Sequence, residues 1–308
     1  MKLSFLELPI DERRLYIEEA AARRGVSPVV LEKDFWVCWL LTVLFRSGFG
    51  EHLVFKGGTS LSKVFGVIDR FSEDIDLSLS PKFLGLEAAG TSRNQATKWM
   101  AKAEAACGVA VRETIAPELE RLVVHVLGER PGGWFEYLTD PATHSPVLLF
   151  HYPTIEPRGF EYLKRSVKLE FGSLTDQQPA GRHPVRPWIA ETLEQALPDW
   201  ACEVVSLEAE RTFWEKATIL HAECHRPAEK PTPDRFSRHY ADTAALAAHP
   251  IADVALKQAK LRIASSSGRR ASSGAAGRGT TSRGPGRSGS CRATSGSSSS
   301  GVTTRRCG

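Results

Sequence analysis

The chain has 308 residues, of which 42% are hydrophobic, so it is long enough for one or two domains with a buried core. Its formal net charge is only +4. The arginines after Ala264 account for this charge, because the rest of the chain is slightly acidic. The overall charge is therefore no argument for nucleic-acid binding, and any RNA or DNA site must be a local patch.

The cysteines and the apolar runs bear on where the protein works. Six cysteines are scattered without a C-x-x-C pair, so we expect free thiols in a reducing compartment rather than a disulfide framework. The N-terminus lacks the apolar segment of a signal peptide. The longest apolar stretch, Phe35–Phe45, is too short to span a bilayer. We therefore expect a cytoplasmic protein that does not engage a membrane.

Residues 1–50 are expected to form an N-terminal helical segment. A first helix begins near Pro9 and ends at Gly25, a residue type that commonly terminates helices. Ser27 and Pro28 suit the N-cap and first position of a second helix. Apolar residues at helical spacing on this second helix favour core packing. They include Phe35, Trp36 and Trp39.

Residues 51–180 alternate between strand and helix patterns, which predicts an α+β core with a mixed sheet and helices. The expected strands are Leu53–Phe55, Ile75–Leu79, Leu122–Leu127, Val147–Tyr152 and Arg165–Phe171. The expected helices are Ser60–Phe65 and residues 93–107.

Residues 181–263 are expected to form a helical C-terminal domain, with helices over Leu207–His225 and Arg235–His249. Residues 264–308 form a low-complexity tail of Ser, Gly, Arg, Thr and Ala. Such a composition cannot bury enough apolar area to offset the entropy of ordering, so we expect disorder. Two other interpretations stay open: a basic RNA-binding arm, or the product of a shifted reading frame, which the nucleotide sequence would reveal.

The segment Leu53–Leu79 carries the most informative pattern, in which a short apolar strand runs into K-G-G-T-S-L-S-K. Two glycines let the backbone turn sharply and approach a ligand closely. The N-terminus of the following helix offers free N–H groups and partial positive charge, which suit a triphosphate. Hydroxyls and a lysine one turn along can add contacts to phosphate. The residues expected to bind the nucleotide here are Lys56, Gly57, Gly58, Thr59, Ser60 and Lys63.

Asp74 and Asp76 lie two residues apart on the next expected strand, so both carboxylates point to one side. Two carboxylates this close repel each other unless a cation lies between them. Mg²⁺ prefers oxygen ligands and leaves room for phosphates. The pattern predicts a two-metal site for nucleotidyl transfer, with Glu170 of V-K-L-E-F as its third carboxylate. The alternative for each acidic residue is a solvated position on a strand.

Three motifs in order resemble a known family. They are F-K-G-G-T-S-L-S-K with R-F-S-E-D-I-D-L, then R-T-F-W-E-K-A-T-I-L-H at 211–221, then R-F-S-R-H-Y-A-D at 235–242. Together they resemble the nucleotidyltransferase AbiEii/AbiGii toxin family of type IV toxin–antitoxin systems, which includes the MenT toxins. The resemblance covers most of residues 28–250.

The resemblance implies a DNA polymerase β-like nucleotidyltransferase core that uses Mg²⁺ and an NTP. It implies transfer of NMP to an acceptor, which for MenT-like members is the tRNA 3′ end, and a cognate antitoxin as partner. Lys216 in the second motif would contact the triphosphate. The expected catalytic residues are Asp74, Asp76, Lys63 and Lys216.

Arg235, Arg238 and His239 in the third motif are candidate contacts for the phosphates of an acceptor RNA, although plain surface charge explains them equally well. Two other functions fit the same sequence. One is nucleotidylation of a hydroxyl on a protein or small molecule. The other is a non-catalytic remnant that binds nucleotide or RNA.

Overall fold

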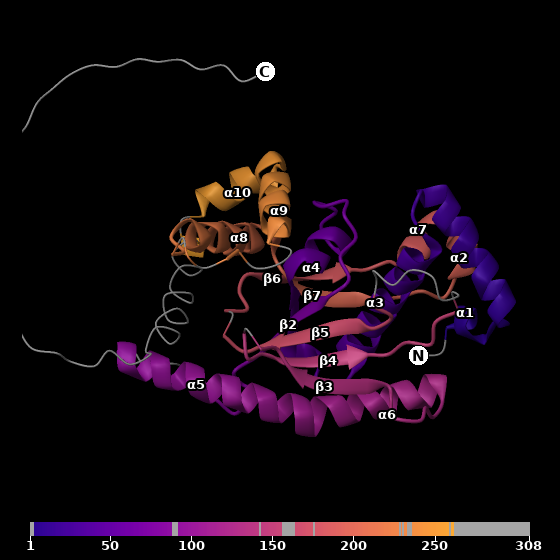
Figure 1. Ribbon diagram of the computed structural model, residues 1–308, viewed down its shortest axis with the longest axis horizontal. Coiled ribbons are helices and arrows are strands. Elements are labelled where there is room, and N and C mark those ends of the chain that lie inside the picture. Colours follow the sequence, from indigo (N-terminus) through magenta and orange to yellow (C-terminus); the bar gives the residue numbers. More distant parts are fainter. Residues whose placement is uncertain are drawn as a thin grey trace, which may run out of the picture. The chain divides into compact units, whose positions relative to one another are not determined.

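The structure, a computed structural model, describes residues 3–87, 92–141, 143–155, 164–174, 176–227, 229, 231–232, 236–258 and 260–261 (Figure 1). The strands are β1 Leu53–Lys56, β2 Ile75–Leu79, β3 Phe135–Thr139, β4 Pro146–Phe150, β5 Val167–Gly172, β6 Ala180–Pro184 and β7 Glu203–Leu207. The helices are α1 Ser4–Glu7, α2 Ile10–Arg24, α3 Pro28–Arg46, α4 Gly57–Lys63, α5 Arg93–Ala110, α6 Ala116–Leu127, α7 Trp188–Thr192, α8 Ala209–Cys224, α9 Ser237–Ala248 and α10 Ile251–Lys257. Short 3-10 turns occupy Gly50–His52 and Glu194–Ala196.

The strands form one seven-stranded mixed sheet with the order β3-β4-β5-β2-β1-β7-β6. Two neighbouring pairs, β1 with β7 and β2 with β5, are parallel, and the other pairs are antiparallel. The predicted α+β class with a mixed sheet is therefore confirmed. Strands β1, β2 and β5, which carry the predicted site, lie next to one another in the middle of the sheet (Figure 1).

Helix α3 forms the centre of the core. The Ser27 side chain accepts a hydrogen bond from the N–H of Val30 at 3.4 Å, and proline follows it at the start of the helix, as predicted. Every residue from Leu31 to Leu44 is buried. Trp39 stacks on Phe150 of β4 with ring centroids 5.8 Å apart. The expected core packing of this aromatic stripe is confirmed.

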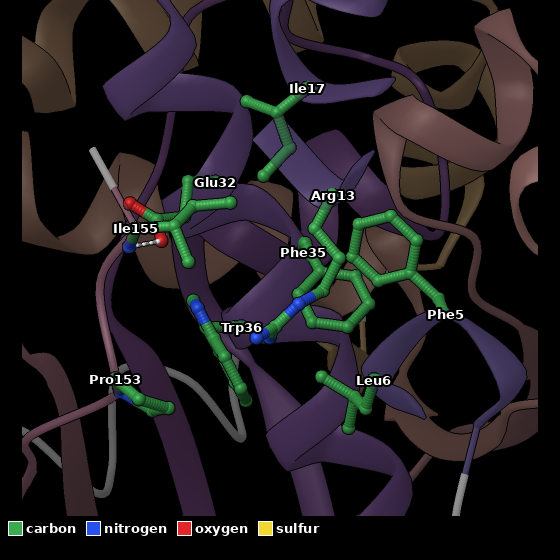
Figure 2. A pocket seen from close by; sticks show the side chains of 9 residues that line it. All are labelled: Phe5, Leu6, Arg13, Ile17, Glu32, Phe35, Trp36, Pro153 and Ile155. Atoms are coloured by element: carbon green, nitrogen blue, oxygen red, sulfur yellow. Dashed lines mark hydrogen bonds between the residues drawn. The ribbon is translucent and has the colours of Figure 1, made fainter. Parts of the chain in front are cut away.

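Three consecutive ionisable residues interrupt the apolar sequence of α3, and all three are buried: Glu32, Lys33 and Asp34 are 1%, 2% and 0% exposed. Glu32 accepts hydrogen bonds at 2.7 Å from both the Thr154 hydroxyl and the backbone N–H of Ile155. Figure 2 shows the second bond beside a cavity of about 10 Å³. Because a buried carboxylate needs partners, this contact fixes the chain that leaves β4 against α3.

Lys33 and Asp34 connect α3 to the segments around the predicted site. Lys33 pairs with Glu73, the residue before Asp74, and Asp34 pairs with Lys63 of α4. Burial raises the pKa of Asp34, and the charge of Lys63 opposes that rise. The Lys63 ammonium also lies 4.5 Å from the ring centroid of Trp188. These contacts position both the turn before β2 and the helix after β1.

One expected strand is wrong: Leu122–Leu127 belongs to helix α6, not to the sheet. The buried residues of α6 are Leu119 and Val123, four positions apart, as one helix face requires. The six-residue apolar run is short enough to suggest a strand on its own. The helical period emerges only with the preceding turn, which continues from α5 through a π-helical segment, Val111–Ile115.

The expectation that residues 181–263 are wholly helical is also wrong at its start. Strands β6 and β7 lie in this region and complete one edge of the sheet. The sheet therefore crosses the domain boundary expected at residue 180. Strand β6, A-G-R-H-P, contains no large apolar residue and lies at the edge, where proline is tolerated. This is why its sequence does not look like a strand.

Helices α8, α9 and α10 follow the sheet, and two of them match the expected C-terminal helices over 207–225 and 235–249. They pack with α4 around a second apolar cluster (Figure 1). That cluster comprises Leu61, Ile68, Ala209, Phe213, Leu246, Ala252 and Ala255. The predicted tail, residues 264–308, lies outside the described residues. Within the described part of the chain, no helix has the length and apolar character to cross a membrane.

The Asp34–Lys63 pair generates a prediction about stability. Lys63→Met should lower the free energy of unfolding by about 3–5 kcal/mol, because it leaves a buried carboxylate without its counter-charge. Urea unfolding followed by circular dichroism measures this change. The double variant Asp34→Leu/Lys63→Met removes both charges and should recover most of the loss. A single variant as stable as the wild type would show that the pair is not what holds α4 on α3.

Candidate active site

Three charged residues lie level with one another on adjacent strands. Lys56 of β1 is the direct partner of Asp76 on β2, and Asp76 is the direct partner of Glu170 on β5. Residues paired in this way project from the same face of a sheet. The strand order thus brings together two of the predicted carboxylates and a lysine that are far apart in the sequence.

The glycines after β1 have a steric reason to be glycine. Gly57 adopts a φ of 85°, and a Cβ at this position would lie 2.1 Å from Oδ2 of Asp76. A Cβ on Gly58 would lie 2.9 Å from a guanidinium nitrogen of Arg70 and 3.2 Å from the Ser72 hydroxyl. The turn therefore brings the backbone against Asp76 on one side and Arg70 on the other.

The two aspartates of the D-x-D pair are held in an environment that disfavours their charge. Burial raises the pKa of Asp76 to about 6; the charge of Lys56 opposes this, while Glu170 and Asp74 add to it. Burial and the neighbouring Glu73 also raise the pKa of Asp74. A bound cation stabilises the charged form of carboxylates whose pKa is raised by burial and by nearby negative charge.

A buried ion-pair cluster lies beside the aspartates. Lys216 of α8 is 7% exposed, and its ammonium donates to Asp242 Oδ2 at 2.8 Å. Arg70 donates two further hydrogen bonds to the same carboxylate, both at 2.8 Å. Burial would raise the pKa of Asp242, but Arg70 and Lys216 outweigh it and lower that pKa. The positive charge of Lys216 also opposes the rise in the pKa of Asp76, so Lys216 interacts electrostatically with the D-x-D pair.

Asp242 and Arg70 lie in this candidate site but are not among the residues predicted from the sequence. Both lay within quoted motifs: Asp242 ends R-F-S-R-H-Y-A-D, and Arg70 begins R-F-S-E-D-I-D-L. The residues predicted from the third motif are basic side chains, Arg235, Arg238 and His239. A buried aspartate that orients a lysine cannot be told from a surface aspartate without the contact between α8 and α9.

Lys63 does not join this group. Its carboxylate neighbours are Asp34 and Glu191, whereas the charged neighbours of Asp76 are Lys56, Glu170, Asp74 and Lys216. The side chain is 3% exposed. The geometry therefore does not fit the predicted contact between Lys63 and phosphate.

Two of the predicted hydroxyls are engaged inside the protein. Thr59 donates to the backbone carbonyl of Asp74 and contacts the Ser72 hydroxyl at 2.8 Å. Ser60 donates to the carbonyl of Gly57 at 2.9 Å. Both residues are buried, at 1% and 0% exposure. In this structure they hold the glycine turn and the start of β2 rather than facing an open site.

The candidate acceptor contacts lie on or before α9. Arg238 is half-exposed, and its guanidinium lies 3.7 Å from Oδ2 of Asp74. The ring of His239 packs against Phe236, with centroids 4.9 Å apart. Arg235 lies outside the described residues. Of the two described residues, Arg238 is thus the one that an ion pair connects to the D-x-D pair.

The donor chemistry of the site fits a divalent cation. Asp76 lies on β2, Asp74 immediately precedes that strand, and both carboxyls have raised pKa values. Oxygen ligands of this kind suit Mg²⁺. Cationic side chains already lie against them, as Arg238 does against Asp74. Within the described ranges, however, no three acidic, histidine or cysteine side chains are gathered closely enough to hold a metal ion as they stand. Glu170 instead pairs with Lys168 at 2.7 Å.

Comparison with known proteins places the chain in a family. The family model described as nucleotidyl transferase AbiEii toxin, type IV TA system, matches residues 39–290, which is more than half of the chain. The chain belongs to this family. The motifs predicted this membership.

Among solved structures, this AbiEii-family chain is similar to MenT4, a nucleotidyltransferase toxin from Mycobacterium tuberculosis H37Rv, with 19% sequence identity and a TM-score of 0.37. The alignment covers 70% of this chain and 65% of MenT4. No curated protein matches the chain.

The buried Asp76 carboxyl predicts how stability changes with pH in the absence of divalent cations. Because folding raises its pKa from 3.8 to about 6, its stabilising contribution is present below the unfolded pKa and is lost as the pH rises through the folded pKa. Asp76→Asn cannot ionise. In EDTA at about pH 8 it should exceed the wild type in stability by on the order of 1–3 kcal/mol, and the difference should fade near pH 4.

Urea unfolding at both pH values measures this effect. Asp253→Asn, at an exposed position on α10, serves as the matched control and should show no such dependence. If Asp76→Asn were equally or less stable than the wild type at the higher pH, the unfavourable ionisation of Asp76 would be disproved.

Proposed function

We propose that this toxin is a Mg²⁺-dependent nucleotidyltransferase that transfers NMP from an NTP to an RNA acceptor, with the tRNA 3′ end as that acceptor. The observation that carries the proposal is the placement of Asp74 and Asp76 beside the Gly57–Gly58 turn and the buried Lys216. Family membership supports nucleotidyl transfer as the reaction class.

In the proposed reaction, a terminal hydroxyl of the acceptor attacks the α-phosphorus of the NTP. The bond from that phosphorus to the bridging oxygen breaks, and pyrophosphate leaves. Asp74 and Asp76 would hold the divalent cation, with Glu170 as a third candidate ligand. Bound there, the cation would supply charge neutralisation and activation of the hydroxyl.

Two lysines are suited to the triphosphate. Lys56 precedes the glycine turn and stands opposite Asp76, and Lys216 is oriented by Asp242. A lysine held by a buried carboxylate keeps its charge and position without rearrangement, which favours stabilisation of charge on a departing pyrophosphate. Gly57 and Gly58 let the backbone approach the phosphates.

Lys63, Thr59 and Ser60 take a different part in this proposal. Their side chains are buried and hold α4, the turn and the start of β2 together. We assign them to positioning of the nucleotide-binding turn, not to direct contact with phosphate.

The acceptor is proposed to lie along α9. Arg238 is half-exposed beside Asp74, where a guanidinium can contact acceptor phosphates next to the reacting hydroxyl. His239 is one residue further on the same helix. The family implies a cognate antitoxin as a partner, and we propose that the toxin acts in the cytoplasm, where NTPs and tRNA are available.

The test is incubation of the purified protein with Mg²⁺, one α-³²P-labelled NTP at a time, and total tRNA. Label should appear on tRNA, and Asp76→Asn and Lys216→Met should each reduce it by about 10³-fold or more, because each removes charge stabilisation from the transition state. Lys82→Met, an exposed lysine after the far end of β2, is the matched control.

Separation of RNA from protein in the same reactions identifies the acceptor. If label appears on protein and Asp76→Asn abolishes it, the acceptor is a protein hydroxyl and not tRNA. No incorporation from any NTP, with EDTA having no effect, would contradict the proposal as a whole.

A further inference from the structure

Lys168 of β5 is a cation surrounded by carboxylates. Its ammonium donates to Glu170 Oε2 at 2.7 Å and lies 3.5 Å from Oδ2 of Asp140. The negative charge of Asp74 acts on it as well. Lys168 also opposes the rise in the pKa of Asp74. The lysine therefore contacts Glu170, one of the carboxylates that the proposed function assigns to a divalent cation, and is near enough to a second, Asp74, to be affected by its charge.

The register of the sheet explains this position. Strands β2 and β5 run parallel, with Ile75 opposite Leu169 and Asp76 opposite Glu170. Continued by one residue, the same register sets Lys168 level with Asp74. Because alternate residues of a strand share a face, Lys168 and Glu170 project to the same side as the D-x-D pair.

Asp140 is held in place by the turn between β3 and β4. Its Oδ1 accepts the backbone N–H of Thr143 at 2.9 Å, and its own backbone pairs with Ser145 and His144. This leaves Oδ2 directed at Lys168. Strand β4 lies between β3 and β5 in the sheet, so the turn after β3 brings a second carboxylate to the lysine from the side opposite β2.

We propose that Lys168 is a resident counter-ion that occupies the cation position between Asp74 and Glu170, and that Asp140 takes the ammonium when a divalent cation enters. This inference rests on the proposed function, because it concerns the same carboxylates. Lys168 and Asp140 are positioning residues, since they act on the availability of Glu170 and Asp74 rather than on the nucleotide.

Three features support the exchange. Without a divalent cation, close carboxylates need positive charge between them, and Lys168 supplies it. With a divalent cation present, an ammonium in the same place would repel it. The lysine side chain is about one-third exposed, at 31%, and has a flexible four-carbon stem, so it can exchange one carboxylate for the other without a change in the strands.

The exchange predicts how metal affinity responds to substitution. Binding of Mn²⁺ to the full chain, followed by calorimetry or by the loss of its free electron paramagnetic resonance signal, is the readout. Lys168→Met should bind Mn²⁺ at least about ten-fold more tightly than the wild type, because a positive charge close to the site is removed. Lys82→Met, remote from the site, should bind as the wild type does. Lys168→Gln serves as a second variant if the methionine variant does not fold.

A double-mutant cycle separates the exchange from a simple effect of charge. Asp140→Asn should weaken Mn²⁺ binding several-fold in the wild type, since the lysine then keeps Glu170. Asp140→Asn should have no effect in the Lys168→Met background, because that variant has no ammonium for Asp140 to bind. Equal weakening in both backgrounds would overturn the role of Asp140 as the receiver.

The same measurements distinguish failure of the inference from failure of the proposed function. If Asp76→Asn abolishes Mn²⁺ binding but Lys168→Met leaves it unchanged, the inference about Lys168 is overturned and the proposed function is not. Binding that does not depend on Asp76 removes the proposed metal site, and the inference is then overturned with it.

Discussion

The structure depends on the three adjacent charges buried in α3. Apolar packing is non-directional, so for a helix that is buried on most faces it restricts rotation and sliding less specifically than charged contacts do. Glu32, Lys33 and Asp34 prevent such movement because each must reach a partner on a different segment. A buried charge separated from its partner costs several kcal/mol. The helix is therefore fixed relative to the chain after β4, the turn before β2 and helix α4.

The same contacts connect the core to the candidate site. Glu73 is next to Asp74, and Lys63 ends the helix that begins at Gly57. The ion pairs from α3 thus position the D-x-D pair and the glycine turn. On the side away from α3, these residues face Lys56, Lys216 and Arg238. This arrangement keeps the structural ion pairs apart from the charges of the candidate site, although both kinds come from the same short segments.

Much of the site could be predicted because its elements are local. A glycine turn after a strand and two aspartates on one strand face are visible in consecutive residues, and β2 has the bounds expected. Lys63 shows the limit of this reasoning: its spacing from the turn suits phosphate, but the choice between a ligand and a buried partner depends on Asp34, which is distant in sequence. Asp242 and Arg70 were missed for the same reason. The mistaken strand over Leu122–Leu127 and the unexpected β6 show that apolar content alone does not distinguish a helix face or an edge strand.

The chain order of the site residues has a consequence for synthesis of the protein. Asp242, which joins Lys216 to Arg70, leaves the ribosome after the other residues of the candidate site, Lys56, Asp76, Glu170 and Lys216. Until α9 has formed against α8, the lysine has no anchor and the cluster beside Gly58 is incomplete. A nascent or truncated chain that ends before α9 therefore carries the whole sheet but an unassembled site. The cluster of Lys216, Asp242 and Arg70 can therefore be complete only when translation of the folded body is nearly finished.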